Sequence, residues 1–191
     1  MKFFSSLALL ALSSAALTFS GTALAQQKLL PAQSEISFVS KQMGVPLDGH
    51  FKKFDAQISF DTAKPEAAKI AFTVDTGSAT LGAPESDAEL PKAAWFNVPK
   101  FPQATFQSSG VKSLGAGKYQ ITGKLSIKGN TRDVDVPVTL TQAGAVTTAV
   151  GQFTLKRLSY KIGEGEWADT SMVADDVQVK FKLALSAMGK L

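Results

Sequence analysis

A nearly unbroken alternation of apolar and polar residues runs from Tyr119 to Lys128. One side of the segment carries Tyr119, Ile121, Gly123, Leu125 and Ile127, and the other carries Gln120, Thr122, Lys124, Ser126 and Lys128. Successive side chains of a strand point to opposite faces, so this segment is predicted to be a strand with one apolar and one hydrated face. A chain built from such strands must bury the apolar faces together.

The same period of two recurs along most of the chain, whereas no helical period is sustained. It predicts eight strands, whose apolar stripes are Ile36–Phe38, Ile58–Phe60, Ile70–Val74, Ala104–Phe106, Tyr119–Ile127, Val134–Leu140, Ala149–Leu155 and Val177–Leu185. Phe51 and Phe54 fall out of register, which predicts a bulge in the second strand over residues 52–55.

The connections are short and rich in Gly, Asn, Asp and Pro, which favours antiparallel pairing. Eight one-sidedly apolar strands can close into a barrel or form a sandwich. A barrel of eight strands is either just filled by side chains or holds one small ligand. Between Thr76 and Val98 the pattern weakens, and we expect a loop with a short helix over residues 85–90 that covers one barrel end.

The first 25 residues have the features of a secretory leader. Lys2 precedes an uncharged apolar run, and Ala23-Leu24-Ala25 has the small-x-small pattern of a cleavage site. The alternative is an uncleaved anchor. We therefore expect a cleaved signal peptide over residues 1–25, a single domain over 26–191, and export to the periplasm.

Several kinds of chemistry have little support. The chain has one histidine, His50, and no cysteine, so a zinc or copper site and a bound cofactor are not expected. The 20 Lys and Arg and 16 Asp and Glu are dispersed, so no nucleic-acid surface is expected. No nucleophile elbow or phosphate loop occurs, and an enzyme is not expected. A carboxylate site for hydrolysis stays open.

Aromatic residues are abundant, with 13 Phe and 2 Trp. The residues predicted to share the interior face are Phe38, Phe72, Phe106, Ile121, Leu125, Phe153 and Phe181. Such positions serve equally as core and as cavity wall. Trp95, Phe96 and Trp167 fall in long connections, where they are expected to form either a gate for a ligand or a plug.

Gly123 and Arg157 are two special positions. Gly123 has inward parity, where a missing side chain leaves room for a ligand or permits tight packing. Arg157 shares parity with Phe153 and Leu155 and is expected to point inward. An inward arginine needs a carboxylate or an anionic ligand. An ion pair with Asp169, Asp175 or Asp176 is the favoured interpretation, and a lipid headgroup is the alternative.

An ordered series of short fragments resembles the YceI-like family over nearly all of residues 26–191. The fragments are Ser34-x-Ile36-x-Phe38, Met43-Gly44, Gly49-x-Phe51-x-x-Phe54, Ile58-x-Phe60-Asp61, Leu90, Trp95-Phe96-Asn97, Phe101-Pro102-x-x-x-Phe106-x-Ser108 and Gly123-x-Leu125-x-Ile127-x-Gly129. The resemblance implies an eight-stranded lipocalin-like antiparallel barrel with an apolar channel for a polyisoprenoid chain. The sequence departs from the family at Lys41, at His50 and over residues 80–87, where a polar headgroup would be met.

The expected function is therefore periplasmic binding or carriage of an isoprenoid lipid, either a polyprenyl chain or an isoprenoid quinone. A membrane-protein donor or acceptor and a homodimer are left open. Three alternatives remain, namely an accessory factor of membrane electron transfer that acts on a bound quinone, a small hydrolase or isomerase with a cavity carboxylate, and a filled barrel with a structural or stress role.

Overall fold

The computed structural model describes residues 27–186 together with 188 and 189, so the expected leader lies outside the described residues. The strands are β1 (Lys28–Leu29), β2 (Glu35–Gln42), β3 (Val45–Phe51), β4 (Phe54–Ser59), β5 (Lys69–Asp75), β6 (Ala79–Thr80), β7 (Gln103–Gly115), β8 (Lys118–Ile127), β9 (Asn130–Ala143), β10 (Val146–Lys156) and β11 (Asp176–Ser186). The α-helix is α1 (Pro84–Glu89), and the 3-10 helices are η1 (Pro31–Gln33), η2 (Pro65–Ala67), η3 (Thr76–Ser78), η4 (Arg157–Tyr160) and η5 (Gly165–Ala168).

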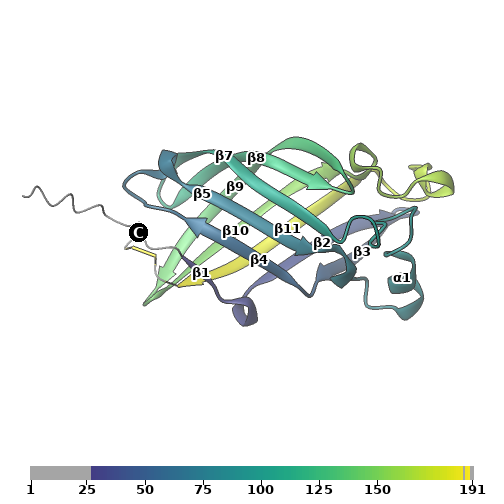
Figure 1. Ribbon diagram of the computed structural model, residues 1–191, viewed down its shortest axis with the longest axis horizontal. Coiled ribbons are helices and arrows are strands. Elements are labelled where there is room, and N and C mark those ends of the chain that lie inside the picture. The colour runs from purple at the N-terminus through teal and green to yellow at the C-terminus, as the bar shows by residue number, and fades with distance from the viewer. Residues whose placement is uncertain (1–26, 187, 190–191) are drawn as a thin grey trace, which may run out of the picture.

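All strands belong to one antiparallel sheet that curls around an apolar interior (Figure 1). Its order is β4-β5-β7-β8-β9-β10-β11-β2-β3-β6, with β1 paired to β11. Most neighbours in space are therefore neighbours in sequence, as short connections require. The all-β antiparallel class predicted from the alternation is confirmed, and so is the short helix near residues 85–90.

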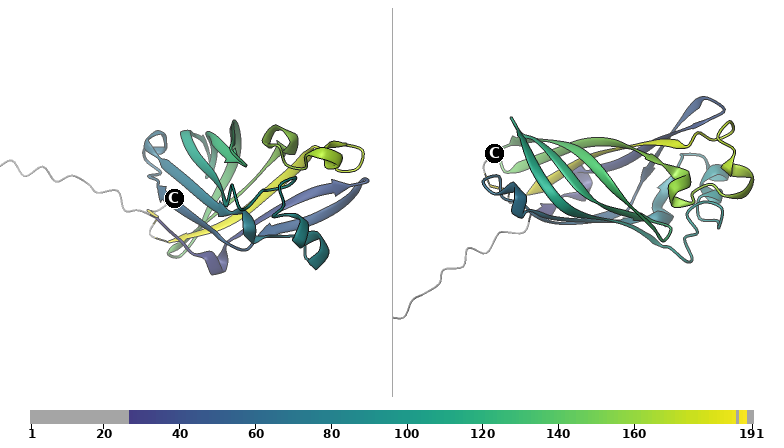
Figure 2. Two further views of the ribbon diagram at one scale, coloured as in Figure 1. Left: turned by 45° about the vertical axis from the view of Figure 1, so that its right-hand side comes forward. Right: turned by 90° about the horizontal axis from the view of Figure 1, so that it is seen from above.

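Three hairpins turn through two residues that both have positive φ. They are Met43-Gly44 between β2 and β3, Ala116-Gly117 between β7 and β8, and Lys128-Gly129 between β8 and β9. This geometry matches the right-handed twist of the flanking strands, and glycine tolerates it at the second position. The long β7–β8–β9 ribbon in Figure 2 follows from two such turns in succession.

The predicted number of strands was too low, and the predicted bulge was wrong. The eight predicted strands correspond to β2, β4, β5 and β7–β11, and the described sheet also contains β1, β3 and β6. Residues 52 and 53 break the chain into β3 and β4, which pair with different neighbours. The reason is local, because Lys52 N donates to Ser78 O at 3.1 Å and Lys53 O accepts from Asp75 N at 3.0 Å.

The short strand β1 joins two strands that the main order leaves apart. Lys28 and Leu29 pair with Ser186 and Leu185 of β11. One residue earlier, Gln27 N donates to Ile58 O of β4 at 2.9 Å. The side chain of Gln27 also accepts from Phe60 N at 2.7 Å. We call this connection the seam, defined by Gln27–Leu29.

The end of the sheet opposite the seam carries the longer connections. Residues 81–102, which include α1, and residues 157–175, which include η4 and η5, lie together there (Figures 1 and 2). We call this region the loop end. Within the described part of the chain, no helix has the length and apolar character needed to cross a bilayer.

Candidate functional site

The interior of the curled sheet contains an apolar cavity of about 240 Å³. One buried cluster, with Leu29, Tyr119 and Leu185 among its members, lies toward the seam, and another, with Leu90, Phe96 and Ile162, lies toward the loop end. The lining side chains are almost entirely hydrocarbon, and Ser40, Trp95, Tyr119 and Arg157 are the ones with polar atoms. Such a wall suits an apolar ligand, because burial of apolar surface is the favourable term.

Most of the residues predicted as site residues lie on this wall. Those that line the cavity are Phe38, Phe72, Trp95, Phe96, Phe106, Ile121, Leu125, Phe153, Phe181 and Arg157. Trp167 is not among the lining residues, but its ring packs at a tilt against Trp95, with centroids 5.6 Å apart. The strand residues among them face the interior together because side chains alternate between the two faces of each strand.

Gly123 does not leave open space in the cavity. A Cβ on Gly123 would lie 2.4 Å from Cζ of Phe106 and 2.6 Å from the carbonyl oxygen of Gln107. The same arrangement recurs at Gly49 under the ring of Phe38 and at Gly151 under the ring of Phe181, each at 2.3 Å from Cζ. The prediction of room for a ligand at Gly123 is therefore corrected to close packing, because a phenylalanine ring occupies that room.

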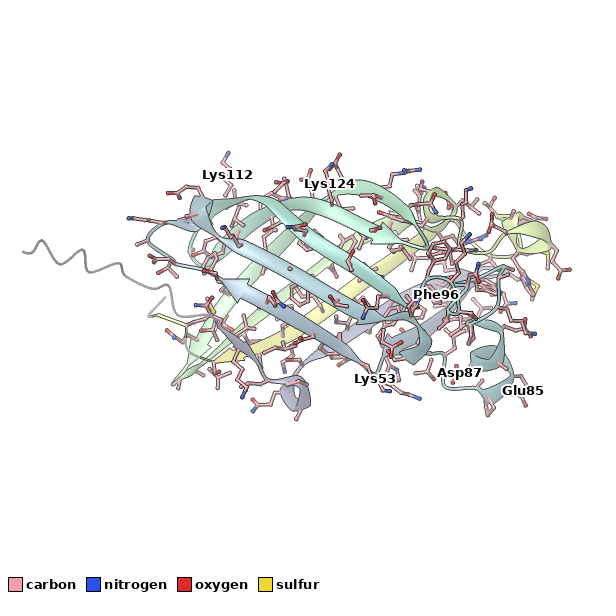
Figure 3. All side chains as sticks on the ribbon, viewed as in Figure 1. Lys53, Glu85, Asp87, Phe96, Lys112 and Lys124 are labelled. Carbon is pink, nitrogen blue, oxygen red and sulfur yellow. The ribbon has the colours of Figure 1, made fainter. Side chains whose placement is uncertain are left out.

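At the loop end, the ring of Phe96 lines the cavity and contacts a row of further aromatic rings. Its ring meets Phe51 edge-on at 6.0 Å, and Phe51 meets Phe38 at 5.4 Å. Figure 3 shows Phe96 at this end, among the converging loops, whereas Lys112 and Lys124 project outward from the strands. Phe96 is buried, and Trp95 and Trp167 are half-buried.

Arg157 points inward as predicted, but its side chain donates to backbone carbonyls in place of the predicted carboxylate. Its guanidinium is buried, with 1% of the residue exposed, and all five of its N–H groups donate to backbone carbonyls. The acceptors are Ala174 at 3.0 Å, Ile162 at 2.9 Å, Gly163 at 3.1 Å, Trp167 at 2.7 Å and Val173 at 2.6 Å. The headgroup role is corrected accordingly, because no donor remains for a ligand.

The predicted ion pair of Arg157 with Asp169, Asp175 or Asp176 is wrong. Asp175 instead accepts from Leu158 N at 2.9 Å, and its carbonyl accepts from Arg157 N at 2.8 Å. Within the described residues, no carboxylate comes close enough to Arg157 to form a salt bridge. Arg157 therefore organises residues 157–175 through their carbonyl groups. Burial lowers the pKa of Arg157, and the nearby Asp175 charge opposes this shift.

Lys128 is a second buried cation at the loop end, and the sequence did not reveal it. Its Nζ donates to Ala93 O at 2.6 Å, to Lys161 O at 2.7 Å and to Glu164 Oε2 at 2.8 Å. The alternation assigns Lys128 to the hydrated face, but its positive φ of 49° in the hairpin turn redirects the side chain. The sequence signal for this exception is Gly129, a residue typical of the second position of such a turn.

The charges at the loop end act within the protein. The hydrogen bond from Lys128 lowers the pKa of Glu164. Thr80 Oγ1 and Leu81 N donate to Asp87, which anchors α1 to β6 and lowers the pKa of Asp87. Burial raises the pKa of Tyr160. No group of three or more His, Asp or Glu residues in the described chain is placed to hold a metal ion.

Other lining residues were not proposed as site residues from the sequence. They include Phe51, Phe60, Tyr119, Leu90, Ile162, Val177 and Val179. Phe60, Val177 and Val179 carry the same alternation signal as the residues that were chosen. Leu90 and Ile162 lie in loops, where no periodicity shows which side chains point inward.

Comparison with known proteins agrees with this geometry. Residues 28–185 match the YceI-like domain. A UPF0312 protein of Azotobacter vinelandii is 41% identical over 132 residues, which cover 67% of this chain and 68% of that protein. A UPF0312 protein of Yersinia pestis is 36% identical over 141 residues, which cover 71% of this chain and 73% of that protein.

Solved structures show the same fold. BcnA of Burkholderia cenocepacia superposes with a TM-score of 0.80 at 46% identity, over 82% of this chain and 99% of that one. A polyisoprenoid binding domain from Saccharophagus degradans, implicated in plant cell wall breakdown, superposes with a TM-score of 0.69 at 17% identity. The superposition covers 84% of this chain and 98% of that domain. The match over residues 28–185 shows that the chain belongs to the YceI-like family.

Proposed function

We propose that this chain binds the apolar tail of an isoprenoid lipid in its cavity and carries the lipid through the periplasm without chemical change. The observation that carries the proposal is the nearly continuous hydrocarbon wall inside the sheet. The structural similarity to a polyisoprenoid binding domain supports the fold that such binding needs.

The arrangement of charge supports binding rather than catalysis. The cationic side chain that lines the cavity, Arg157, has all its donors on backbone carbonyls. A general acid or base must reach the reacting atoms of a bound molecule. The periplasmic location follows from the expected leader over residues 1–25 and forms part of the proposal.

Native mass spectrometry of the protein purified from its own periplasm tests the proposal. We expect a bound lipid mass that is lost on denaturation. Ala149 lines the cavity and Val150, the next residue, is 48% exposed, so the pair Ala149→Phe and Val150→Phe adds the same ring inside and outside. Ala149→Phe should lose the lipid and Val150→Phe should keep it, provided that thermal unfolding shows both to be folded. A folded Ala149→Phe protein with undiminished lipid would contradict the proposal.

A further inference from the structure

The indole N–H of Trp95 is a buried donor without an acceptor. Among the described residues, two buried side-chain polar atoms lack a hydrogen-bond partner, Nε1 of Trp95 and Oγ1 of Thr147. Trp95 lines the cavity, whereas Thr147 is not among the lining residues. Buried donors are normally paired, so an orphan N–H on a residue that lines the cavity calls for an explanation.

The backbone around Trp95 is fixed from several directions. Lys128 Nζ donates to Ala93 O, and the amides of Gly163 and Glu164 donate to Ala94 O at 2.8 and 2.9 Å. Trp95 N donates to Lys92 O at 3.0 Å. The ring itself is only half-buried and lies against Trp167 at an interplanar angle of 46°. Because Nε1 is buried, an acceptor in the cavity would reach it through a shift of the half-buried ring, while the backbone of the loop stays in place.

The two buried cationic side chains at this end, Arg157 and Lys128, are already paired. Arg157 and Lys128 give all their N–H groups to carbonyl and carboxylate oxygens. An anionic group that entered this end would meet no cationic donor without a partner among these residues, and an unpaired charge is costly to bury. An uncharged oxygen would carry no such cost and could accept from an indole N–H.

We propose that Trp95 Nε1–H donates to an uncharged oxygen acceptor, such as a carbonyl, on the polar end of the bound lipid. The polar end then lies at the loop end, and the tail extends toward the seam. This proposal rests on the lipid binding proposed above and adds the chemistry that the site selects. An acceptor that satisfies a buried donor strengthens binding by about 5- to 150-fold.

Three probes with the same isoprenoid chain test this selectivity, namely farnesylacetone with a ketone, farnesene without oxygen, and farnesyl phosphate with an anion. Each is measured by displacement of a fluorescent lipid from the delipidated full chain, wild type and variants. The variants are Trp95→Phe, which removes the orphan N–H, and Trp167→Phe, which is the matched control. Trp167→Phe removes an N–H from the ring that packs against Trp95.

We expect the ratio of ketone to hydrocarbon affinity to fall by about 5- to 150-fold in Trp95→Phe and to stay near the wild-type ratio in Trp167→Phe. The comparison between proteins cancels the probes' own differences in solubility. An unchanged ratio in Trp95→Phe, or a wild-type preference for the phosphate, overturns the inference. If the wild-type protein bound none of the three probes, the proposed lipid binding would be contradicted as well as this inference.

A second measurement needs no change in the cavity. The chain has two tryptophans, so Trp167→Phe assigns the indole resonances in a ¹H–¹⁵N spectrum. The Nε1 proton of Trp95 should move downfield when wild type binds farnesylacetone and should not do so with farnesene. The same shift with both probes, or with neither, overturns the inference even if Trp95→Phe fails to fold.

Discussion

At the scale of single residues, three glycines set the positions of three phenylalanine rings in the cavity wall. Gly49 faces Phe38 and Gly151 faces Phe181 directly across the strands, while Gly123 lies diagonally from Phe106. Each ring lies against the backbone where a side chain would otherwise stand. The rings therefore add apolar wall without filling the cavity, which explains how so many aromatic residues leave space inside.

Gly123→Ala tests this arrangement. The new Cβ would meet both the Phe106 ring and the Gln107 carbonyl, so we expect a loss of about 1–3 kcal/mol in the free energy of unfolding. The displaced Phe106 ring would enter the cavity and reduce lipid retention. Chemical denaturation and native mass spectrometry measure the two effects. Gly189→Ala is the control, since no atom lies within 4 Å of the added carbon. A variant as stable as the control would contradict this packing.

At the scale of elements, the ion pair between Lys128 and Glu164 connects the β8–β9 turn to residues 157–175. The folded-state pKa of Glu164 is lowered by the hydrogen bond from Lys128. A lowered carboxyl pKa contributes stability above the unfolded-state pKa, and this contribution disappears as the pH falls through the folded-state pKa.

Glu164→Gln should therefore be less stable than wild type at about pH 7, and the difference should shrink as the pH falls below the usual glutamate pKa of about 4.3. The effect should be small, because the Glu164 side chain is 49% exposed. Thermal unfolding measured across this range gives the difference. If the difference in stability between wild type and Glu164→Gln grew as the pH fell, the prediction would be contradicted.

The seam is the second element whose role can be measured. Gln27→Ala removes the acceptor of Phe60 N, a buried contact, and should lower the free energy of unfolding by about 1–3 kcal/mol. Lys28→Ala is the matched control, because Lys28 is exposed and pairs through its backbone. Urea unfolding compares the two variants. Equal stability would mean that the Gln27 side chain contributes little to closing the sheet.

The elements that the sequence predicted well are those in which a single local rule decides the structure. Tyr119–Ile127 became β8 because alternation alone fixes a half-buried strand. Strand β3 was not separated from β4, because Pro46, Asp48 and Gly49 are poor strand residues and its pairing with β2 overrides that preference. The partners of Arg157 were missed because they are backbone carbonyls in an irregular loop, and composition carries no information about where these point.

At the scale of the whole molecule, the apolar cavity predicts that lipid binding and stability are linked. A ligand that binds only the folded state adds about 2.7 kcal/mol at a free concentration 100 times its Kd. Extraction of the lipid should therefore lower Tm, and reloading should restore it. Differential scanning calorimetry follows both steps, with Ala149→Phe as the protein that should not respond. A Tm indifferent to lipid in wild type would contradict selective binding to the folded state.

The seam would take on a further role if residues 1–25 are removed as the sequence predicts. Cleavage after Ala25 would leave Gln27 as the second residue of the exported protein, next to the new terminus. The hydrogen bonds that join Gln27 to Ile58 and Phe60 would then depend on where the leader is cut. A cut two residues further along would remove Gln27 and leave Phe60 N without its acceptor. The position of leader cleavage would thus help to determine whether the mature sheet closes.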